Sequence, residues 1–95
     1  MNKRPFIKDM NISLKIFCNS DRIRFKTWVK RFTSVLSAYN KTETIILFLI
    51  YNKGYSRKGV TAITGLNYYQ FNTFIYKFRY TDEFNILTAK NKNYI

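Results

Sequence analysis

The chain has 95 residues, with 17 lysines and arginines against 5 acidic residues, which gives a net charge of +12 at neutral pH. Its hydrophobic share of 46% and aromatic share of 19% exclude a disordered basic tail and predict one small folded domain. So much charge on so small a body favours an anionic partner, either nucleic acid or an anionic membrane surface.

The first 18 residues predict a flexible arm followed by a strand. Residues 1–10 contain Pro5 and mixed charge, so we expect an arm whose Lys3 and Arg4 either reach a nucleic-acid groove or belong to a frayed terminus. Residues 11–18 alternate in polarity, which is typical of a strand, with a helix start as the alternative. We expect the single Cys18 to be a small buried side chain. One cysteine cannot form a disulfide within the chain, which favours a reducing compartment and hence a cytoplasmic protein.

A long amphipathic helix is predicted over residues 20–39. Its apolar residues follow the spacing of one buried helix face, namely Phe25, Trp28, Val29, Phe32, Val35, Leu36 and Tyr39. The other side carries Arg22, Lys26 and Lys30 at steps of four, which suits phosphate contacts and equally suits an ordinary solvated face. Because the apolar face is rich in aromatics for so small a domain, we expect part of it to be buried in a twofold homodimer.

Residues 40–54 predict a short helix at the centre of the fold. Asn40 or Thr42 suits its N-cap, and Glu43 is well placed near the positive end of the helix. Residues 45–51 are apolar on every side, which indicates burial all round. This segment is far shorter than the ~20 residues that cross a bilayer, so no membrane span is expected.

Residues 56–79 predict two helices joined by a glycine turn. Ser56 suits the first N-cap, Gly65 a left-handed helix end and Asn67 the second N-cap, while Val60 and Ile63 form an apolar ridge. The buried face of the second helix comprises Phe71, Phe74, Ile75 and Phe78. Its opposite side carries Tyr68, Tyr69, Gln70, Asn72, Thr73, Tyr76 and Lys77. Amides, hydroxyls and a lysine on an exposed helix suit base edges and phosphates.

The stretch Val60-Thr61-Ala62-Ile63-Thr64-Gly65-Leu66-Asn67 resembles the signature of the helix-turn-helix DNA-binding family. In that signature an apolar and a small residue precede a glycine, an apolar residue and a capped recognition helix. The chain has Thr61 where the family usually has alanine, and Asn67 where it usually has serine. A plain helical hairpin with an aromatic core is the alternative interpretation.

Residues 80–95 resemble the wing of a winged helix-turn-helix protein. Residues 84–88 suit one strand and 94–95 a return strand, with Lys90 and Lys92 at the tip of the polar turn between them. A frayed tail is the alternative. The resemblance therefore implies a mainly α fold with a small β-hairpin wing (α+β), formed as a single winged helix-turn-helix domain over residues 1–95.

The function implied by this resemblance is sequence-specific binding of double-stranded DNA, with residues 67–78 in the major groove. Base contacts are expected from Gln70, Asn72 and Thr73, with Tyr68 and Tyr69 in the same groove. Phosphate contacts are expected from Ser56, Arg57, Lys58 and Lys77, from Lys90 and Lys92 on the wing, and additionally from Arg22, Lys26 and Lys30. The size and layout are similar to those of plasmid or phage accessory proteins that mark an origin of transfer or a partition site, and transcription regulation is equally open.

Other functions remain open at the level of sequence. The tyrosines suit a binder of single-stranded nucleic acid or RNA, the helix over residues 21–39 suits in part a membrane-surface module, and a protein-interaction module is the weakest alternative. Catalysis has little support, because there is no histidine and none of the three glycines lies in a phosphate-binding run. We therefore expect no enzymatic activity, cofactor, metal or small-molecule ligand.

Overall fold

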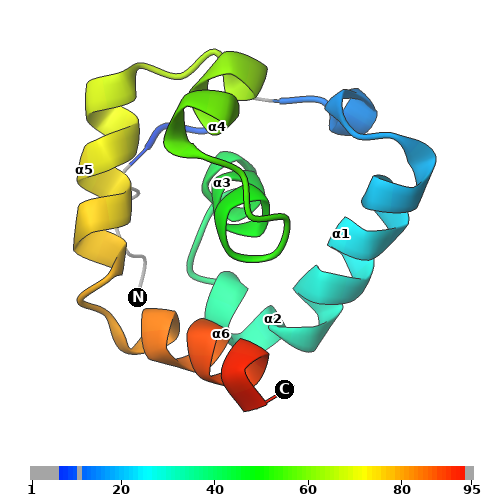
Figure 1. The fold of residues 1–95 in the computed structure, drawn as a ribbon, viewed down its shortest axis with the longest axis vertical. Helices are drawn as coiled ribbons and strands as arrows, with labels where there is room; N and C mark the ends of the chain where they lie inside the picture. The colour runs from blue at the N-terminus through cyan, green and yellow to red at the C-terminus, as the bar shows by residue number, and fades with distance from the viewer. Residues whose placement is uncertain (1–6, 11, 94–95) are drawn as a thin grey trace.

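The computed structural model describes residues 7–10 and 12–93, which form helices and no strands. In chain order these are η1 (Leu14–Ile16), α1 (Asn19–Arg31), α2 (Thr33–Leu36), α3 (Lys41–Tyr51), α4 (Arg57–Thr64), α5 (Tyr68–Phe78) and α6 (Asp82–Asn93). Figure 1 shows α3 in the centre, with the other helices arranged around it.

Helix α3 is the core of the domain, as its sequence predicts. Residues 45–49 are all buried, because the helix is apolar on every side and other elements surround it. Asn40 and Glu43 form a capping box at its start: the Glu43 N–H donates to Asn40 Oδ1 at 2.8 Å, and the Asn40 N–H donates to Glu43 Oε1 at 3.1 Å.

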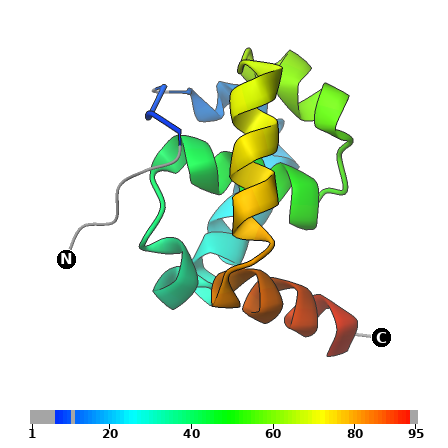
Figure 2. The same ribbon diagram turned by 90° about the vertical axis from the view of Figure 1, so that its left-hand side faces the viewer.

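Aromatic contacts join the outer helices to opposite sides of α3. On one side, α1 places the rings of Phe25 and Trp28 at 5.1 Å and 5.5 Å from the ring of Phe48. On the other side, α5 places Phe78 at 5.7 Å from the ring of Tyr51. Figures 1 and 2 agree that α1 and α5 lie across α3 from one another. A ligand bound along the outer side of α5 would therefore lie on the opposite side of the domain from α1.

The N-terminal segment differs from the expected arm and strand. Ile7 is buried, its N–H donates to Glu43 Oε2 at 3.0 Å, and its carbonyl accepts from Asn40 Nδ2 at 2.7 Å. Residues 7–10 therefore lie against the start of α3, while Lys3 and Arg4 lie outside the described residues. The predicted strand over residues 11–18 is wrong, because the part of the chain that the structure describes supplies no strand to pair with it and η1 forms instead. Cys18, expected to be buried, is exposed.

The predicted long helix over residues 20–39 is interrupted at Phe32. Helix α1 ends at Arg31, and Phe32 has φ −111° and ψ 30°, outside the helical range. The Thr33 hydroxyl donates to the carbonyls of Val29 and Lys30, both at 3.0 Å, and so helps to satisfy the end of α1. The apolar pattern continues through the break, since both helices bury the same side against α3.

The predicted wing is wrong, because residues 82–93 form helix α6, and the return strand expected over residues 94–95 lies outside the described residues. The Thr81 hydroxyl accepts from the Phe84 N–H at 3.3 Å, and Asp82 and Glu83 occupy the first turn, where the helix dipole favours acids. Phe84 and Leu87 then lie three positions apart, and both pack against the core. The fold is accordingly an all-helical one over the described residues, not an α+β winged helix-turn-helix.

Candidate nucleic-acid interface

Helices α4 and α5 meet at a glycine turn that the sequence predicted correctly. Ser56 Oγ accepts from the Gly59 N–H at 3.0 Å at the start of α4. Gly65 ends α4 with φ 74°, a left-handed conformation that only glycine adopts at little cost. Asn67 Oδ1 accepts from the N–H groups of Tyr69 and Gln70 at 2.9 Å and 3.1 Å, which caps α5.

The inner side of α5 fixes its rotation about its own axis. Phe71, Phe74 and Phe78 are fully buried and Ile75 is nearly so, as predicted. In α4, Val60 is buried and Thr64 joins it, whereas Ile63, expected in the same ridge, is partly exposed. With four apolar side chains held in the core, α5 presents one defined side to solvent.

The outer side of α5 is a row of tyrosines and polar groups. Tyr69 is 78% exposed, Tyr76 63% and Tyr80 76%, and the rings of Tyr76 and Tyr80 are 5.2 Å apart. Gln70 and Lys77 are also exposed, Tyr68 is half-exposed, and Asn72 and Thr73 are half-buried at the edges of this side. Of the residues expected to read bases, Gln70 and Tyr69 project most fully into solvent.

A hydrogen bond joins two predicted site residues that lie 15 positions apart. The Arg57 guanidinium, on the first turn of α4, donates through Nη1 to Asn72 Oδ1 at 2.9 Å. Bidentate reading of adenine by asparagine uses both its carbonyl oxygen and its amide nitrogen. Because Asn72 Oδ1 accepts from Arg57, the Asn72 side chain orients this cation. Gln70 is then the amide side chain of α5 that is available to contact a base.

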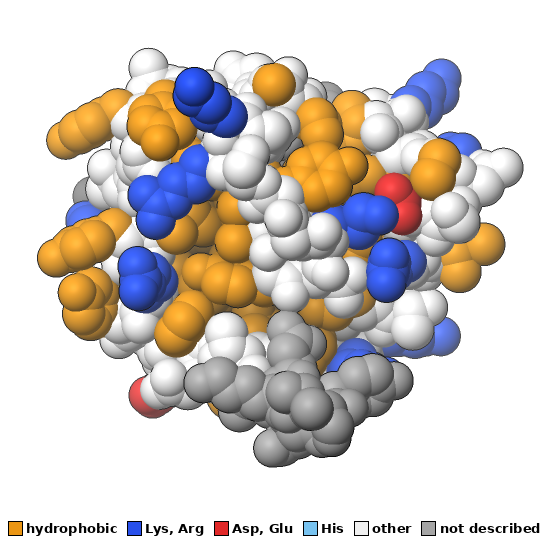
Figure 3. Space-filling model, in the orientation of Figure 1, with side chains coloured by type: hydrophobic (Ala, Val, Ile, Leu, Met, Phe, Trp, Pro, Cys, Tyr) orange, Lys and Arg blue, Asp and Glu red, His pale blue; other side chains and the backbone are white. Residues whose placement is uncertain are grey.

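Positive charge surrounds α4 and α5 without acidic residues between them. The sequence has no aspartate or glutamate between Glu43 and Asp82. Arg57, Lys58, Lys77 and Arg79 are all exposed. Figure 3 shows separate Lys and Arg side chains on the left of the view, where α5 lies in Figure 1, with apolar surface between them, and further Lys and Arg side chains on the right. Arg79 was missed by the sequence analysis, because it follows the end of α5 and only the fold brings it near Arg57.

Arg57 and Arg79 stand at the rim of a groove of about 400 Å³. Its other lining residues are Ile50, Tyr51, Tyr55, Ser56, Ile75 and Phe84, from α3 to α6. Burial raises the pKa of Tyr51, and the positive charges of Arg79 and Arg57 oppose this shift. The two guanidinium groups therefore both act on the Tyr51 hydroxyl, although one belongs to α4 and the other follows the end of α5.

The other predicted contact residues lie elsewhere. Arg22, Lys26 and Lys30 are on α1, on the far side of α3 from α5 (Figures 1 and 2). Lys90 and Lys92 fall in α6, and their side chains lie outside what the structure describes. The structure therefore brings together the residues predicted on α4 and α5, and it separates them from the α1 residues.

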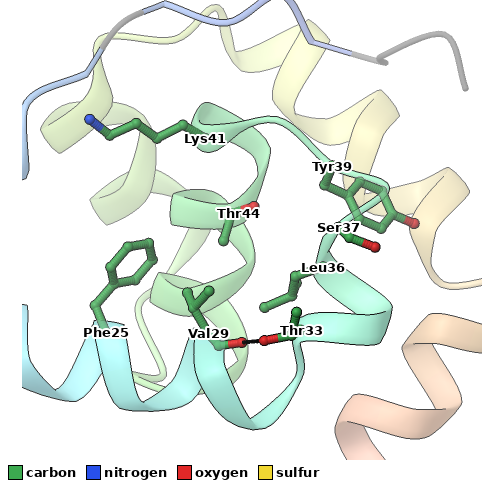
Figure 4. A pocket seen from close by; sticks show the side chains of 8 residues that line it. All are labelled: Phe25, Val29, Thr33, Leu36, Ser37, Tyr39, Lys41 and Thr44. Atoms are coloured by element: carbon green, nitrogen blue, oxygen red, sulfur yellow. Dashed lines mark hydrogen bonds between the residues drawn. The ribbon is translucent and has the colours of Figure 1, made fainter. Parts of the chain in front are cut away.

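A second pocket, of about 300 Å³, lies between α1, α2 and α3. Its lining comprises Phe25, Val29, Thr33, Leu36, Ser37, Tyr39, Lys41 and Thr44 (Figure 4). The hydroxyls of Thr33, Ser37 and Thr44 all donate to backbone carbonyls three or four positions earlier in the chain. The walls are thus mainly hydrocarbon, and Tyr39 and Lys41 are the two titratable residues of this lining.

Two further observations bear on the class of the protein. Among the residues that the structure describes, no group of three histidine, cysteine or acidic side chains is placed to hold a metal ion. None of the helices in the described part has the length and apolar character that a bilayer crossing requires. Comparisons of the chain with protein-family models, with curated proteins and with solved structures found no match.

Proposed function

We propose that the chain is a non-enzymatic, sequence-specific binder of double-stranded DNA that places the outer side of α5 in the major groove. The observation that carries this proposal is the rigid presentation of that side. Four buried apolar residues fix α5 from beneath, and two caps and the Gly65 turn fix its start. A helix held in this way inserts into a groove without a further cost in backbone conformational entropy.

The surrounding charges favour the phosphate backbone as the partner. Arg57 and Lys58 lie at the start of α4, whereas Lys77 and Arg79 lie at the end of α5. Arg57 bonds to Asn72 midway along α5 and lines the same groove as Arg79, so these cations lie beside the middle and the end of the row of polar side chains. In a complex with duplex DNA they would contact phosphates beside the groove while Gln70 reaches base edges.

Within this proposal there is no longer a reason to expect a homodimer. It rested on an aromatic face of residues 20–39 too large for one small domain. That face is covered within the chain itself, where Phe25, Trp28, Phe32 and Tyr39 are all buried. The proposed contact needs one α4–α5 unit, and a cytoplasmic role in transcription regulation or in plasmid or phage DNA processing is compatible with it.

The test is a site selection followed by amide substitution. Random duplexes would be enriched on the purified protein, and the affinity of the selected duplex measured by fluorescence anisotropy. Gln70→Ala should weaken this duplex by about 1–3 kcal/mol and leave random duplex unchanged. Asn85→Ala, which removes an exposed amide from α6, is the matched control and should change neither affinity. Equal loss on both duplexes with Gln70→Ala would remove α5 from sequence reading.

Single-stranded nucleic acid is a second candidate, favoured by the exposed tyrosines. Tyr69, Tyr76 and Tyr80 offer rings on one helix side, and stacking of a base on such a ring is worth about 1–3 kcal/mol. Competition of the labelled selected duplex with an unlabelled single strand separates the two functions. If the single strand displaces the duplex at equal or lower concentration, and Tyr76→Leu abolishes this effect, stacking is the main interaction.

A further inference from the structure

Helix α1 carries a second cationic surface that the proposed α5 contact does not use. Its members are Arg22, Arg24, Lys26, Lys30 and Arg31, all at least partly exposed. The helix has one acidic residue, Asp21, and that carboxylate pairs with Lys53 from the end of α3 at 2.9 Å. Lys53 and, to a smaller extent, Arg24 lower the pKa of Asp21, and α1 has no further acidic residue for its other four cations. We refer to these five residues as the α1 surface.

The α1 surface and the α5 side are too far apart to act on one stretch of duplex. Each helix packs on α3 from an opposite side (Figures 1 and 2). Two successive helix packings of about 8–10 Å each place the axes of α1 and α5 roughly 16–20 Å apart. Because DNA is stiff over about 150 base pairs, a short duplex lying along α5 cannot turn around the domain to reach α1.

Ionic screening weakens the electrostatic coupling between the two surfaces. The Debye length is about 8 Å at physiological ionic strength, so charges roughly 16–20 Å apart interact weakly through solvent. Screening is smaller across the core around α3, so a polyanion on α5 reduces the attraction of α1 for a second polyanion without abolishing it.

The exposed residues of α1 suit phosphates better than they suit a membrane. An interfacial helix needs a broad apolar side, whereas the described residues of α1 expose one large apolar side chain, Ile23, at 67%. The aromatic residues of the helix, Phe25 and Trp28, are buried against α3. Cations lie on both sides of Ile23 along the helix, and each cation that neutralises a phosphate releases counterions.

We propose that the α1 surface binds the phosphate backbone of a second DNA duplex, so that one protomer joins two DNA segments. The inference rests on the proposed function for the first duplex, which α5 holds. Contacts by α1 would be independent of sequence, because they come from cations spread around a convex helix and not from amides in a groove.

The experiment is a bridging assay with two duplexes. One duplex carrying the selected site is attached to beads, a second fluorescent duplex is free in solution, and the protein is added at limiting concentration. The wild-type chain should retain the fluorescent duplex on the beads. Lys26→Glu combined with Lys30→Glu should reduce retention at least ~10-fold, since each lost phosphate contact removes counterion release. The same variant should bind a single labelled duplex within about 3-fold of wild type.

Two further variants complete the design. Lys58→Glu with Lys77→Glu, on the α4–α5 side, should weaken binding of the single labelled duplex, which the α1 variant spares. Lys8→Glu with Lys41→Glu makes the same change in charge at exposed residues that belong to neither surface and should leave bridging close to wild type. Circular dichroism of each variant checks that the helices are intact.

The outcomes separate this inference from the proposed function. If the wild-type chain binds one duplex and does not bridge, the α1 inference is wrong and the function of α5 stands. If the α1 variant still bridges, two copies of the chain join the segments through another surface, and the inference is again wrong. If the variant loses binding to anionic vesicles but not bridging, α1 is a membrane surface. If no duplex binds at all, the proposed function itself fails.

Discussion

The salt dependence of duplex binding measures how many cations of the α4–α5 side contact phosphates. Four exposed cations surround it: Arg57, Lys58, Lys77 and Arg79. Each phosphate contact contributes about −0.9 to the slope of log K against log salt concentration, so four give a slope of roughly −3.6. Raising KCl from ~50 to ~200 mM should then weaken binding about 150-fold. If the cations of α1 touched the same duplex, the slope would be roughly −8.

A single substitution tests the assignment of each contact. Lys77→Gln should reduce the slope to about −2.7, because one phosphate contact is lost. Lys15→Gln removes an exposed lysine from η1 and should leave the slope unchanged. Fluorescence anisotropy of a short site-bearing duplex at several KCl concentrations measures both. A flat response in the wild-type chain, or equal changes in the two variants, would refute the contact assignment.

Three predictions concern the structure that presents this surface. Gly65→Ala should lower the free energy of unfolding by about 1–2 kcal/mol in urea titrations, because φ is +74° although nothing lies within 4 Å of the added methyl group. An unchanged stability would contradict the left-handed turn. Asn67→Ala should cost about 1 kcal/mol by removing the α5 cap, whereas Asn67→Asp should retain most of it. Burial, with Glu83 nearby, raises the pKa of Tyr39 from 10.0 to about 12, so its neutral form stabilises the fold below pH 10 and this contribution is lost as the pH rises to 12. Tyr39→Phe should weaken the decline of thermal stability in that window, and an identical decline would contradict the shift.

Features that depend on neighbours in the sequence were predicted correctly. The capping box of Asn40 and Glu43, the Ser56 and Asn67 caps and the Gly65 turn each involve atoms a few positions apart. Such signals are set by local backbone geometry and do not depend on what the rest of the chain supplies. The central position of α3 was also predictable, since a segment that is apolar on every side must be surrounded.

Features that need a distant partner were predicted wrongly. Residues 11–18 and 84–88 both have compositions compatible with a strand, yet a strand is stable only beside another strand. For residues 84–88 the competing signals were visible: Thr81 as a cap, two acids in the first turn, and Phe84 and Leu87 three positions apart. The prediction of a wing gave more weight to the resemblance to a winged fold than to these helix signals.

The candidate site was predictable in part. The exposure of Tyr69, Gln70 and Lys77 followed from the helical period of α5. The bond from Arg57 to Asn72 and the approach of Arg79 to Arg57 did not, because they depend on the angle between α4 and α5 and on the path of the chain after α5. Periodicity assigns a residue to a side of a helix, whereas the packing of helices decides which sides meet.

The replacement of the wing by α6 changes how the charge of this chain is best explained. A wing would have added cations next to the α5 side, and contact with a single duplex would then have accounted for much of the excess positive charge. Instead, α6 packs Leu87 into the core, Tyr39 donates to Glu83 at 3.3 Å, and the ring of Phe84 lies 6.1 Å from that of Phe78, so α6 packs against the end of α5. Four exposed cations then remain around α4 and α5, while five others lie on α1, across the domain. Because mutual repulsion destabilises a small basic domain unless a partner neutralises it, two separate anionic partners explain this distribution better than one.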